Sequence, residues 1–225
     1  MLENSDYNAD SNSALRHKIV WYVNGLIYDL LMNDVHRRLY RDVIEALGDL
    51  DGQKIDDIGC GTGEIIQLLP ETADVRGIDY SAAALLNARK KCPSENVKFT
   101  EMDFYGQLPD DRRPDKIVAC RSLYHHDLTV SMAMIYHQLN DGGSAVLIHP
   151  KPRVKDFMLP KKGDKRFFNL TQFIKSAPRV LSKIFGYPYH LFEAQDFEEA
   201  GNKFFSKVEV RDAAFGTHYL IYCEK

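Results

Sequence analysis

Residues 54–63 read K-I-D-D-I-G-C-G-T-G, in which a short strand-like segment runs directly into three glycines at alternate positions. Gly59, Gly61 and Gly63 predict a tight turn whose bare backbone lets a ligand approach closely. The dinucleotide-binding turn has the pattern G-x-G-x-x-G, so the third glycine here comes one residue early. The turn alone leaves two interpretations open: a site for an adenosine-containing ligand, or a purely structural turn.

Asp56 is unusual in this stretch, because a strand buried on both faces normally has an aliphatic side chain at such a position. We expect its carboxylate to face the N-terminal helices and to pair with a basic residue such as Arg37 or Arg41.

Strands and helices alternate after residue 54. Strands are predicted at 54–58, 75–79, 97–102, 116–120 and 144–149, and helices at 64–69, 81–91 and 129–139. A further helix at 194–201 precedes strands at 206–211 and 218–224, which a short loop joins into an antiparallel hairpin. Strands separated by helices form right-handed crossovers and a parallel sheet. The predicted fold class is therefore α/β: a Rossmann-like sheet of seven strands, mostly parallel, with an antiparallel C-terminal hairpin.

The chain of 225 residues is predicted to form one domain. Residues 1–13 are a polar flexible tail, and 14–50 form a helical cap with two helices between His17 and Leu47. Residues 151–193 are an insertion between the fifth and sixth strands, which we expect to act as a lid over the substrate.

Composition indicates an ordinary globular protein, with 44% hydrophobic and 27% charged residues. The four cysteines lack C-x-x-C spacing, so we expect reduced thiols and no metal site. No apolar run approaches the roughly 18 residues of a membrane span, and no signal peptide is evident. The expected location is the cytoplasm.

Three acids lie at the ends of predicted strands, at the edge where the carboxyl ends of parallel strands meet. Asp79 can accept hydrogen bonds from both ribose hydroxyls, and Asp103 from the adenine amino group, with Phe104 covering the adenine face. Asp57 can position a cationic amino group. Each acid taken singly is also typical of a turn or helix cap. Together at one edge they favour the adenosine site.

The stretches D-D-I-G-C-G-T-G, R-G-I-D-Y-S, F-T-E-M-D-F and D-K-I-V-A-C-R-S-L-Y-H-H resemble the successive motifs of class I S-adenosylmethionine-dependent methyltransferases. The resemblance covers about residues 54–150, and the N-terminal helices with the H-H pair resemble the small-molecule branch. Asp56 departs from the family, which usually has Leu or Val there. The resemblance implies S-adenosyl-L-methionine as cofactor and a small molecule as methyl acceptor.

The same resemblance implies that the cofactor contacts lie on the turns after the first four strands and on the first helix. The residues are Asp57, Gly59, Cys60, Gly61, Asp79, Tyr80, Asp103, Phe104, Cys120, Arg121, Tyr22 and Tyr28. For Tyr22 and Tyr28, closing over the cofactor and ordinary helix packing are both open.

Three histidines, His125, His126 and His149, follow the fourth and fifth strands, where the substrate is expected. Histidine suits a general base that deprotonates an oxygen or nitrogen nucleophile. Two alternatives are that these histidines cap or pack, and that methyl transfer proceeds by proximity alone.

Residues 151–183 hold ten basic and two acidic residues, a net charge of +8, which leaves −11 on the rest of a chain whose total is −3. Apolar residues interleave with the basic ones. Three interpretations are open: a solvated lid with an apolar underside, selection of an anionic acceptor, or docking on an anionic membrane surface or an acidic carrier protein.

Other functions are less favoured. Base-modifying methyltransferases carry an Asn/Asp-Pro-Pro-aromatic element where this chain has Arg121-Ser122-Leu123-Tyr124, so no nucleic-acid substrate is expected. The alternatives are a non-catalytic cofactor-binding or regulatory subunit and, against the glycine spacing, a nicotinamide oxidoreductase. The sequence leaves the oligomeric state open.

Overall fold

The structure is a computed structural model that describes residues 33–103, 112–124, 126–152 and 190–225. These residues belong to one compact unit, Asp34–Met158 with His190–Lys225. A second unit, Met1–Asn33 with Leu159–Tyr189, lies outside the described residues apart from Asn33. The predicted first helix and most of the predicted lid therefore lie outside the described residues.

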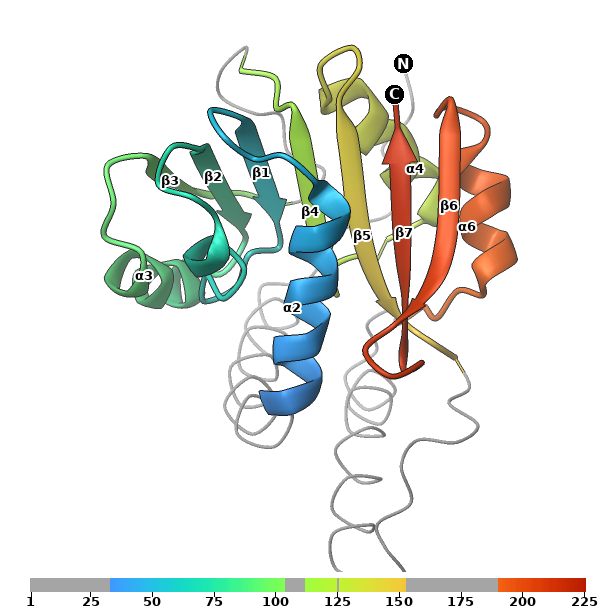
Figure 1. Cartoon of the computed structure of the whole chain (residues 1–225), viewed down its shortest axis with the longest axis horizontal. Coiled ribbons are helices and arrows are strands. Elements are labelled where there is room, and N and C mark those ends of the chain that lie inside the picture. The colour runs from blue at the N-terminus through green and yellow to red at the C-terminus, as the bar shows by residue number, and fades with distance from the viewer. Residues whose placement is uncertain (1–32, 104–111, 125, 153–189) are drawn as a thin grey trace, which may run out of the picture. The chain divides into compact units, whose positions relative to one another are not determined.

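Seven strands form one sheet in the order β3-β2-β1-β4-β5-β7-β6 (Figure 1). The strands are β1 (Lys54–Ile58), β2 (Asp74–Asp79), β3 (Val97–Glu101), β4 (Lys116–Cys120), β5 (Ser144–Pro150), β6 (Lys207–Ala213) and β7 (His218–Glu224). Neighbours among β1 to β5 pair in parallel, whereas β7 runs antiparallel to both β5 and β6. The predicted fold class is confirmed.

The sheet is covered by α-helices on both faces. The helices are α2 (Asn33–Leu47), α3 (Ala82–Lys91), α4 (Leu128–Gln138) and α6 (Ala194–Gly201). Figure 1 shows α2 in front of the sheet and α4 and α6 behind it. The start of α3 is fixed as predicted, because the Ser81 hydroxyl accepts a hydrogen bond from the Ala84 N–H.

The helix predicted from Glu64 to Leu69 is wrong. The chain there forms turns and one short 3₁₀ helix, η1 (Ile66–Leu68). Gly63 still turns the chain with φ +82°, and Leu69 is already extended, as expected for a residue before a proline. Too few residues remain between that glycine and Pro70 for an α-helix.

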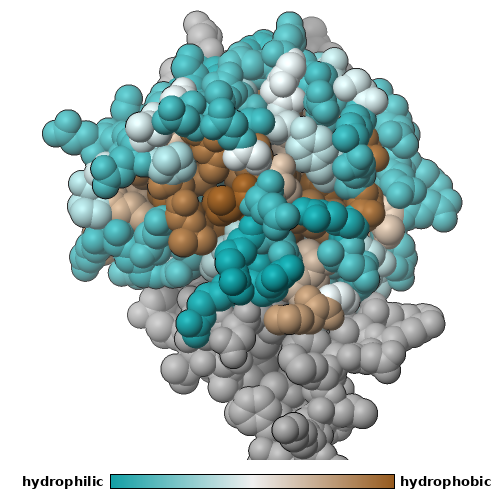
Figure 2. Space-filling model, viewed as in Figure 1, coloured by the Kyte–Doolittle hydropathy of each residue, from teal (hydrophilic) through white to brown (hydrophobic). Residues whose placement is uncertain are grey.

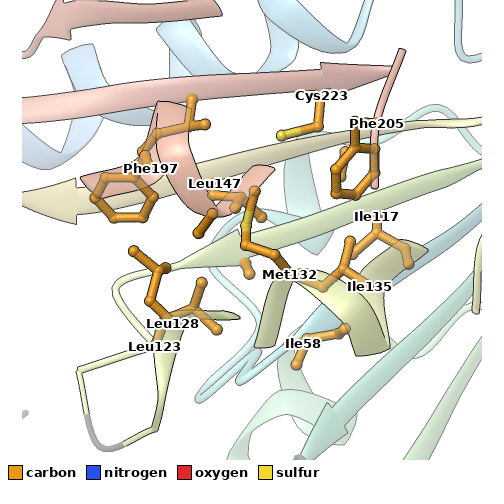
Figure 3. Close-up of a cluster of buried hydrophobic side chains, with 14 of the residues drawn as sticks. Ile58, Ile117, Leu123, Leu128, Met132, Ile135, Leu147, Phe197, Phe205 and Cys223 are labelled. Atoms are coloured by element: carbon orange, nitrogen blue, oxygen red, sulfur yellow. The ribbon is translucent and has the colours of Figure 1, made fainter. Parts of the chain in front are cut away.

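The main core lies behind the sheet, between β4, β5 and β7 and the two helices α4 and α6 (Figure 3). Phe197, Met132 and Leu147 are fully buried at its centre. Burying a large apolar side chain of this kind stabilises the fold by about 1.5–3 kcal/mol. This packing holds β4 and β5, and therefore the loops that leave their carboxyl ends, in fixed positions.

On the front face, α2 buries Leu39 and Val43 and exposes its basic residues. Figure 2 shows the exposed face of α2 as a hydrophilic band with apolar surface on either side. The helix is tied to the β6–β7 turn, because Asp42 Oδ2 accepts a hydrogen bond of 3.0 Å from the Ala214 N–H. That turn lies at the carboxyl edge of the parallel strands, since Pro150 at the end of β5 pairs with His218.

Candidate cofactor-binding site

The glycine turn follows β1 at the carboxyl edge of the sheet. Gly59, Gly61 and Gly63 have φ of +72°, +54° and +82°, a conformation that L-residues with a side chain rarely adopt. The N–H groups of Gly59 and Cys60 both donate to the Ile78 carbonyl of β2, at 2.7 and 3.0 Å. These bonds hold the turn between β1 and β2, as the alternate glycines predict.

Two of the glycines serve different purposes. A Cβ on Gly59 would lie 2.3 Å from Ser122 Cβ, so the turn after β1 packs directly against the loop after β4. A Cβ on Gly61 would meet nothing within 4 Å. Gly61 therefore keeps its surroundings open, which suits the close approach of a ligand.

Asp79 ends β2 and is 8% exposed. Its Oδ1 accepts from the Ser81 N–H at 2.8 Å, and its Oδ2 accepts from the Gly61 N–H at 2.9 Å. Burial raises the pKa of Asp79, and these two backbone hydrogen bonds oppose the rise. Each carboxylate oxygen retains a further acceptor site, so Asp79 can still bind a pair of hydroxyls.

Asp57 lies at the carboxyl end of β1 and is 2% exposed. Burial raises the pKa of Asp57 to about 7, and the negative charges of Asp79 and Asp56 add to the rise. Cys60 is also buried here, and burial raises the pKa of its thiol well above the usual value. The site is therefore acidic, desolvated and suited to a ligand that brings a positive charge.

Asp56 has partners other than those we expected from the sequence. It is fully buried and in register with Arg76 of β2, whose Nη2 lies 2.5 Å from its Oδ2. Arg112 Nη1 binds the other carboxylate oxygen, Oδ1. The prediction of Arg37 or Arg41 as partner is wrong, because both side chains are exposed on α2. The sequence signal was present but missed: Arg76 is a second charged residue in a buried strand.

The loop after β4 contributes Arg121, which the sequence predicted as a cofactor-binding residue, and Ser122, which it did not. Arg121 has φ +58°, and its Nη1 donates to His36 Nε2 of α2 at 2.9 Å. Burial, together with the Arg121 guanidinium, lowers the pKa of His36 to about 3. Ser122 Oγ is buried beside Gly59, and no described residue forms a hydrogen bond with it. The neighbouring Cys120 is a neutral thiol, since burial raises its pKa to about 11.

The three candidate histidines do not share one environment. His149 is 1% exposed, its Nε2 accepts from the Phe192 N–H at 3.2 Å, and burial lowers its pKa to about 3. Its ring packs against Tyr124, Phe192 and Phe197 at centroid distances of 5.2–5.6 Å. His126 is partly exposed after β4. His125 lies outside the described residues.

The remaining predicted cofactor residues are only partly described. Tyr80 is half-buried after β2, and Asp103 is exposed after β3. The Met102 N–H donates to the Asp79 carbonyl at 3.0 Å, which brings the start of the Asp103 turn next to the end of β2. Phe104, Tyr22 and Tyr28 lie outside the described residues.

These groups fit a nucleoside ligand that carries a cationic amino group. Asp79 could accept hydrogen bonds from ribose hydroxyls, and Asp57 could pair its buried carboxylate with the amino group. Gly61 leaves open space, and the buried Ser122 hydroxyl offers a further polar contact. All of these groups lie at the carboxyl ends of β1 and β2 or on the turns after β1 and β4.

Comparison with known proteins gives the same result. Residues 55–143 match a family described as "Methyltransferase domain". A ubiquinone biosynthesis O-methyltransferase of Acinetobacter baumannii is 33% identical over 94 residues, which cover 41% of this chain and 36% of the relative. A trans-aconitate 2-methyltransferase of Delftia acidovorans is 30% identical over 103 residues, 43% of this chain and 38% of the relative. The matched region thus spans little more than a third of these curated relatives.

Solved structures share the fold. The N-methyltransferase NodS from Bradyrhizobium japonicum, bound to S-adenosyl-L-homocysteine, has a TM-score of 0.61 at 15% identity, covering 85% of this chain and 87% of its own. An S-adenosylmethionine-dependent methyltransferase from Mesorhizobium loti has a TM-score of 0.60 at 17% identity, covering 82% and 96%. The chain therefore has the fold of these methyltransferases, and its residues 55–143 are similar to a methyltransferase domain. The buried carboxylates and the open glycine turn fit S-adenosylmethionine as a cofactor.

Among the residues that the structure describes, no helix has the length and apolarity to cross a membrane.

Proposed function

We propose that this protein transfers a methyl group from S-adenosylmethionine to an oxygen or nitrogen of a small molecule. The observation that carries the proposal is the pair of buried carboxylates, Asp57 and Asp79, beside the open glycine turn at the carboxyl edge of the sheet. The names of the two curated relatives, which refer to ubiquinone and trans-aconitate chemistry, support a small-molecule acceptor.

When bound, S-adenosylmethionine supplies an electrophilic methyl group on a sulfonium, ready for in-line displacement. The protein then needs mainly to align the acceptor atom with that group. Alignment at near-attack distance can account for about 7–11 kcal/mol of the barrier. Asp79 fixes the ribose and Asp57 the amino group, while the backbone of Gly59, Gly61 and Arg121 shapes the methionine end.

A base is needed where the acceptor must lose a proton. His126, partly exposed after β4, and His125 next to it are the better candidates for this role. His149 suits it less, because burial among aromatic rings lowers its pKa to about 3. Single-turnover methyl transfer by His125→Ala and His126→Ala variants across pH 6 to 9 tests this, with His149→Gln as the matched comparison. Unchanged rates in both alanine variants would exclude a histidine base after β4.

We further propose that the basic segment 151–183 selects an anionic acceptor. The alternative is that the segment binds a lipid or carrier-bound acceptor. Co-sedimentation with anionic vesicles at low and high salt distinguishes a soluble anionic acceptor from a membrane-associated one. Salt-sensitive binding to vesicles would favour a membrane-associated acceptor, and its absence would remove that version.

The central experiment measures both cofactor binding and methyl transfer. Calorimetry with S-adenosylhomocysteine measures the site, and labelled S-adenosylmethionine incubated with a metabolite pool measures transfer. The Asp79→Asn variant should weaken binding about 10- to 100-fold, because a hydrogen bond to a charged group contributes about 1.5–3 kcal/mol. The matched control is Glu71→Gln, which alters an exposed carboxylate before β2.

Two outcomes would favour other functions. Tight binding of S-adenosylhomocysteine with no labelled product from any pool would favour a cofactor-binding or regulatory subunit. Stabilisation by NAD but not by S-adenosylhomocysteine would favour a nicotinamide oxidoreductase.

A further inference from the structure

The charges of Asp79 and Asp56 both act on Asp57, but the three carboxylates are not equivalent. Asp56 is held by two arginines, Arg76 and Arg112. Asp79 accepts two backbone N–H groups. Asp57 lies between them in the chain and is 2% exposed, yet no described residue donates a hydrogen bond to its carboxylate or pairs with it. Within the described part of the chain, its negative charge therefore has no counterpart.

The described groups around Asp57 give it no positive charge. From β2 it faces Asp79, and the nearby Arg76 is directed at Asp56. The charge of Asp57 also reaches three thiols, those of Cys60 in the glycine turn, Cys92 at the end of α3 and Cys120 at the end of β4. Each of these thiols has its pKa raised, in part by the charge of Asp57.

On the β4 side, Arg121 binds His36 of α2 through its Nη1. Among the described residues, the charges that act on the Asp57 carboxyl group are those of Asp79 and Asp56, and both raise its pKa. An ionised Asp57 thus adds a negative charge to a buried acidic cluster, which is costly without a cation.

We propose that Asp57 carries a proton in the ligand-free domain and releases it to solvent when the cationic amino group of S-adenosylmethionine or S-adenosylhomocysteine binds. The inference rests on the proposed cofactor site and concerns the linkage between its occupancy and proton release. No covalent bond forms or breaks apart from the O–H bond of the carboxyl group. After proton release, the Asp57 carboxylate pairs with the ammonium group of the ligand. This ion pair takes the place of the neutral carboxyl group of the ligand-free domain.

The direction of the pH dependence follows from competition between the proton and the ligand for Asp57. At low pH the proton on Asp57 competes with the ligand, so the affinity falls as the pH drops below about 7. For one proton and a free-state pKa of about 7, the affinity for S-adenosylhomocysteine should rise ~20-fold between pH 5.5 and pH 7.5. Above that range the ligand's own α-amino group, whose pKa is about 8, begins to lose its proton.

Calorimetry of S-adenosylhomocysteine binding to the full chain tests the linkage, with each pH measured in two buffers of different ionisation enthalpy. At pH 6.5 the wild type should release about 0.8 proton per ligand, which is the fraction of Asp57 still protonated. The Asp57→Asn variant should release none and bind more weakly at pH 7.5, with a flat pH profile between 5.5 and 7.5. Glu71→Gln should behave as the wild type.

A second measurement needs no variant. Difference infrared spectroscopy of the wild type at pH 6.5 should show a protonated carboxyl band that disappears when S-adenosylhomocysteine is added. Binding with no proton release and no loss of this band overturns the linkage and leaves the proposed function intact. Failure of S-adenosylhomocysteine to bind at any pH overturns both.

Discussion

Replacing Asp56 by leucine should destabilise the domain strongly, although leucine is the residue type expected in that strand. In the wild type the Arg76 guanidinium, itself 3% exposed, contacts Asp56 through Nη2 at 2.5 Å and through Nε at 3.2 and 3.3 Å. Burial raises the pKa of Asp56, and both arginines oppose that rise. The Asp56→Leu variant leaves Arg76 buried without its counter-charge.

Removing one partner of a buried ion pair typically costs about 3–5 kcal/mol. For a chain of this size each kcal/mol corresponds to a shift of about 2–4 °C in melting temperature, so a loss of roughly 6–20 °C is expected. Urea unfolding followed by circular dichroism gives the free energy directly. The matched control is Asp74→Leu, because Asp74 pairs with Arg112 at 3.1 Å but is 48% exposed and should cost less than about 1 kcal/mol.

A double variant separates loss of the pair from loss of packing. Buried ion pairs can often be replaced by apolar residues of similar volume without loss of stability. The Asp56→Leu/Arg76→Met protein should therefore recover most of the stability that Asp56→Leu loses. The reasoning is refuted if Asp56→Leu alone is as stable as the wild type, or if the double variant is less stable than the single one.

Three further changes probe the buried groups of the site by urea unfolding. Asp57→Asn should stabilise the free domain above pH 7, by about 4 kcal/mol, and should have little effect near pH 4. The pKa of Asp57 is about 7 in the folded state and 3.8 in the unfolded state, so the stability of the wild type falls as the pH rises from 3.8 to 7. Equal stability of Asp57→Asn and the wild type at pH 8 would contradict this. The folded-state pKa of His149, about 3 against 6.5 unfolded, makes the wild type lose about 5 kcal/mol of stability as the pH falls from 6.5 to 3. His149→Gln should lack this loss and therefore show a flatter fall in stability on acidification. An unchanged fall would assign the loss to other groups. Gly59→Ala should lower the free energy of unfolding by about 2 kcal/mol or more, because the new Cβ would sit at a φ of +72° and 2.3 Å from Ser122 Cβ. Gly61→Ala has no such contact and should lower it less. Equal losses in the two variants would mean that the contact with Ser122 relaxes freely.

Local sequence patterns predicted much of the part of the fold that the structure describes. Six of the seven predicted strands lie within one residue of their observed ends, and β6 extends two residues beyond its prediction. The helix at Ala194–Gly201 was predicted with its observed bounds. These elements follow from hydrophobic periodicity and turn residues, which act over a few positions in the chain. The helix predicted at 64–69 failed because Pro70 and three left-handed glycines outweighed the local apolar pattern.

The sequence by itself determined the order of strands and helices, the glycine turn and the acids at strand ends. These features depend on residue type at fixed spacing, so they can be read without knowing what lies across the sheet. Only the tertiary structure decided the electrostatic state of each acid. Asp56 and Asp57 are adjacent in the chain, yet Asp56 faces two arginines from 20 and 56 residues away and Asp57 faces another carboxylate. Burial and charge depend on neighbours that are distant in sequence, and for that reason two like residues side by side acquire different chemistry.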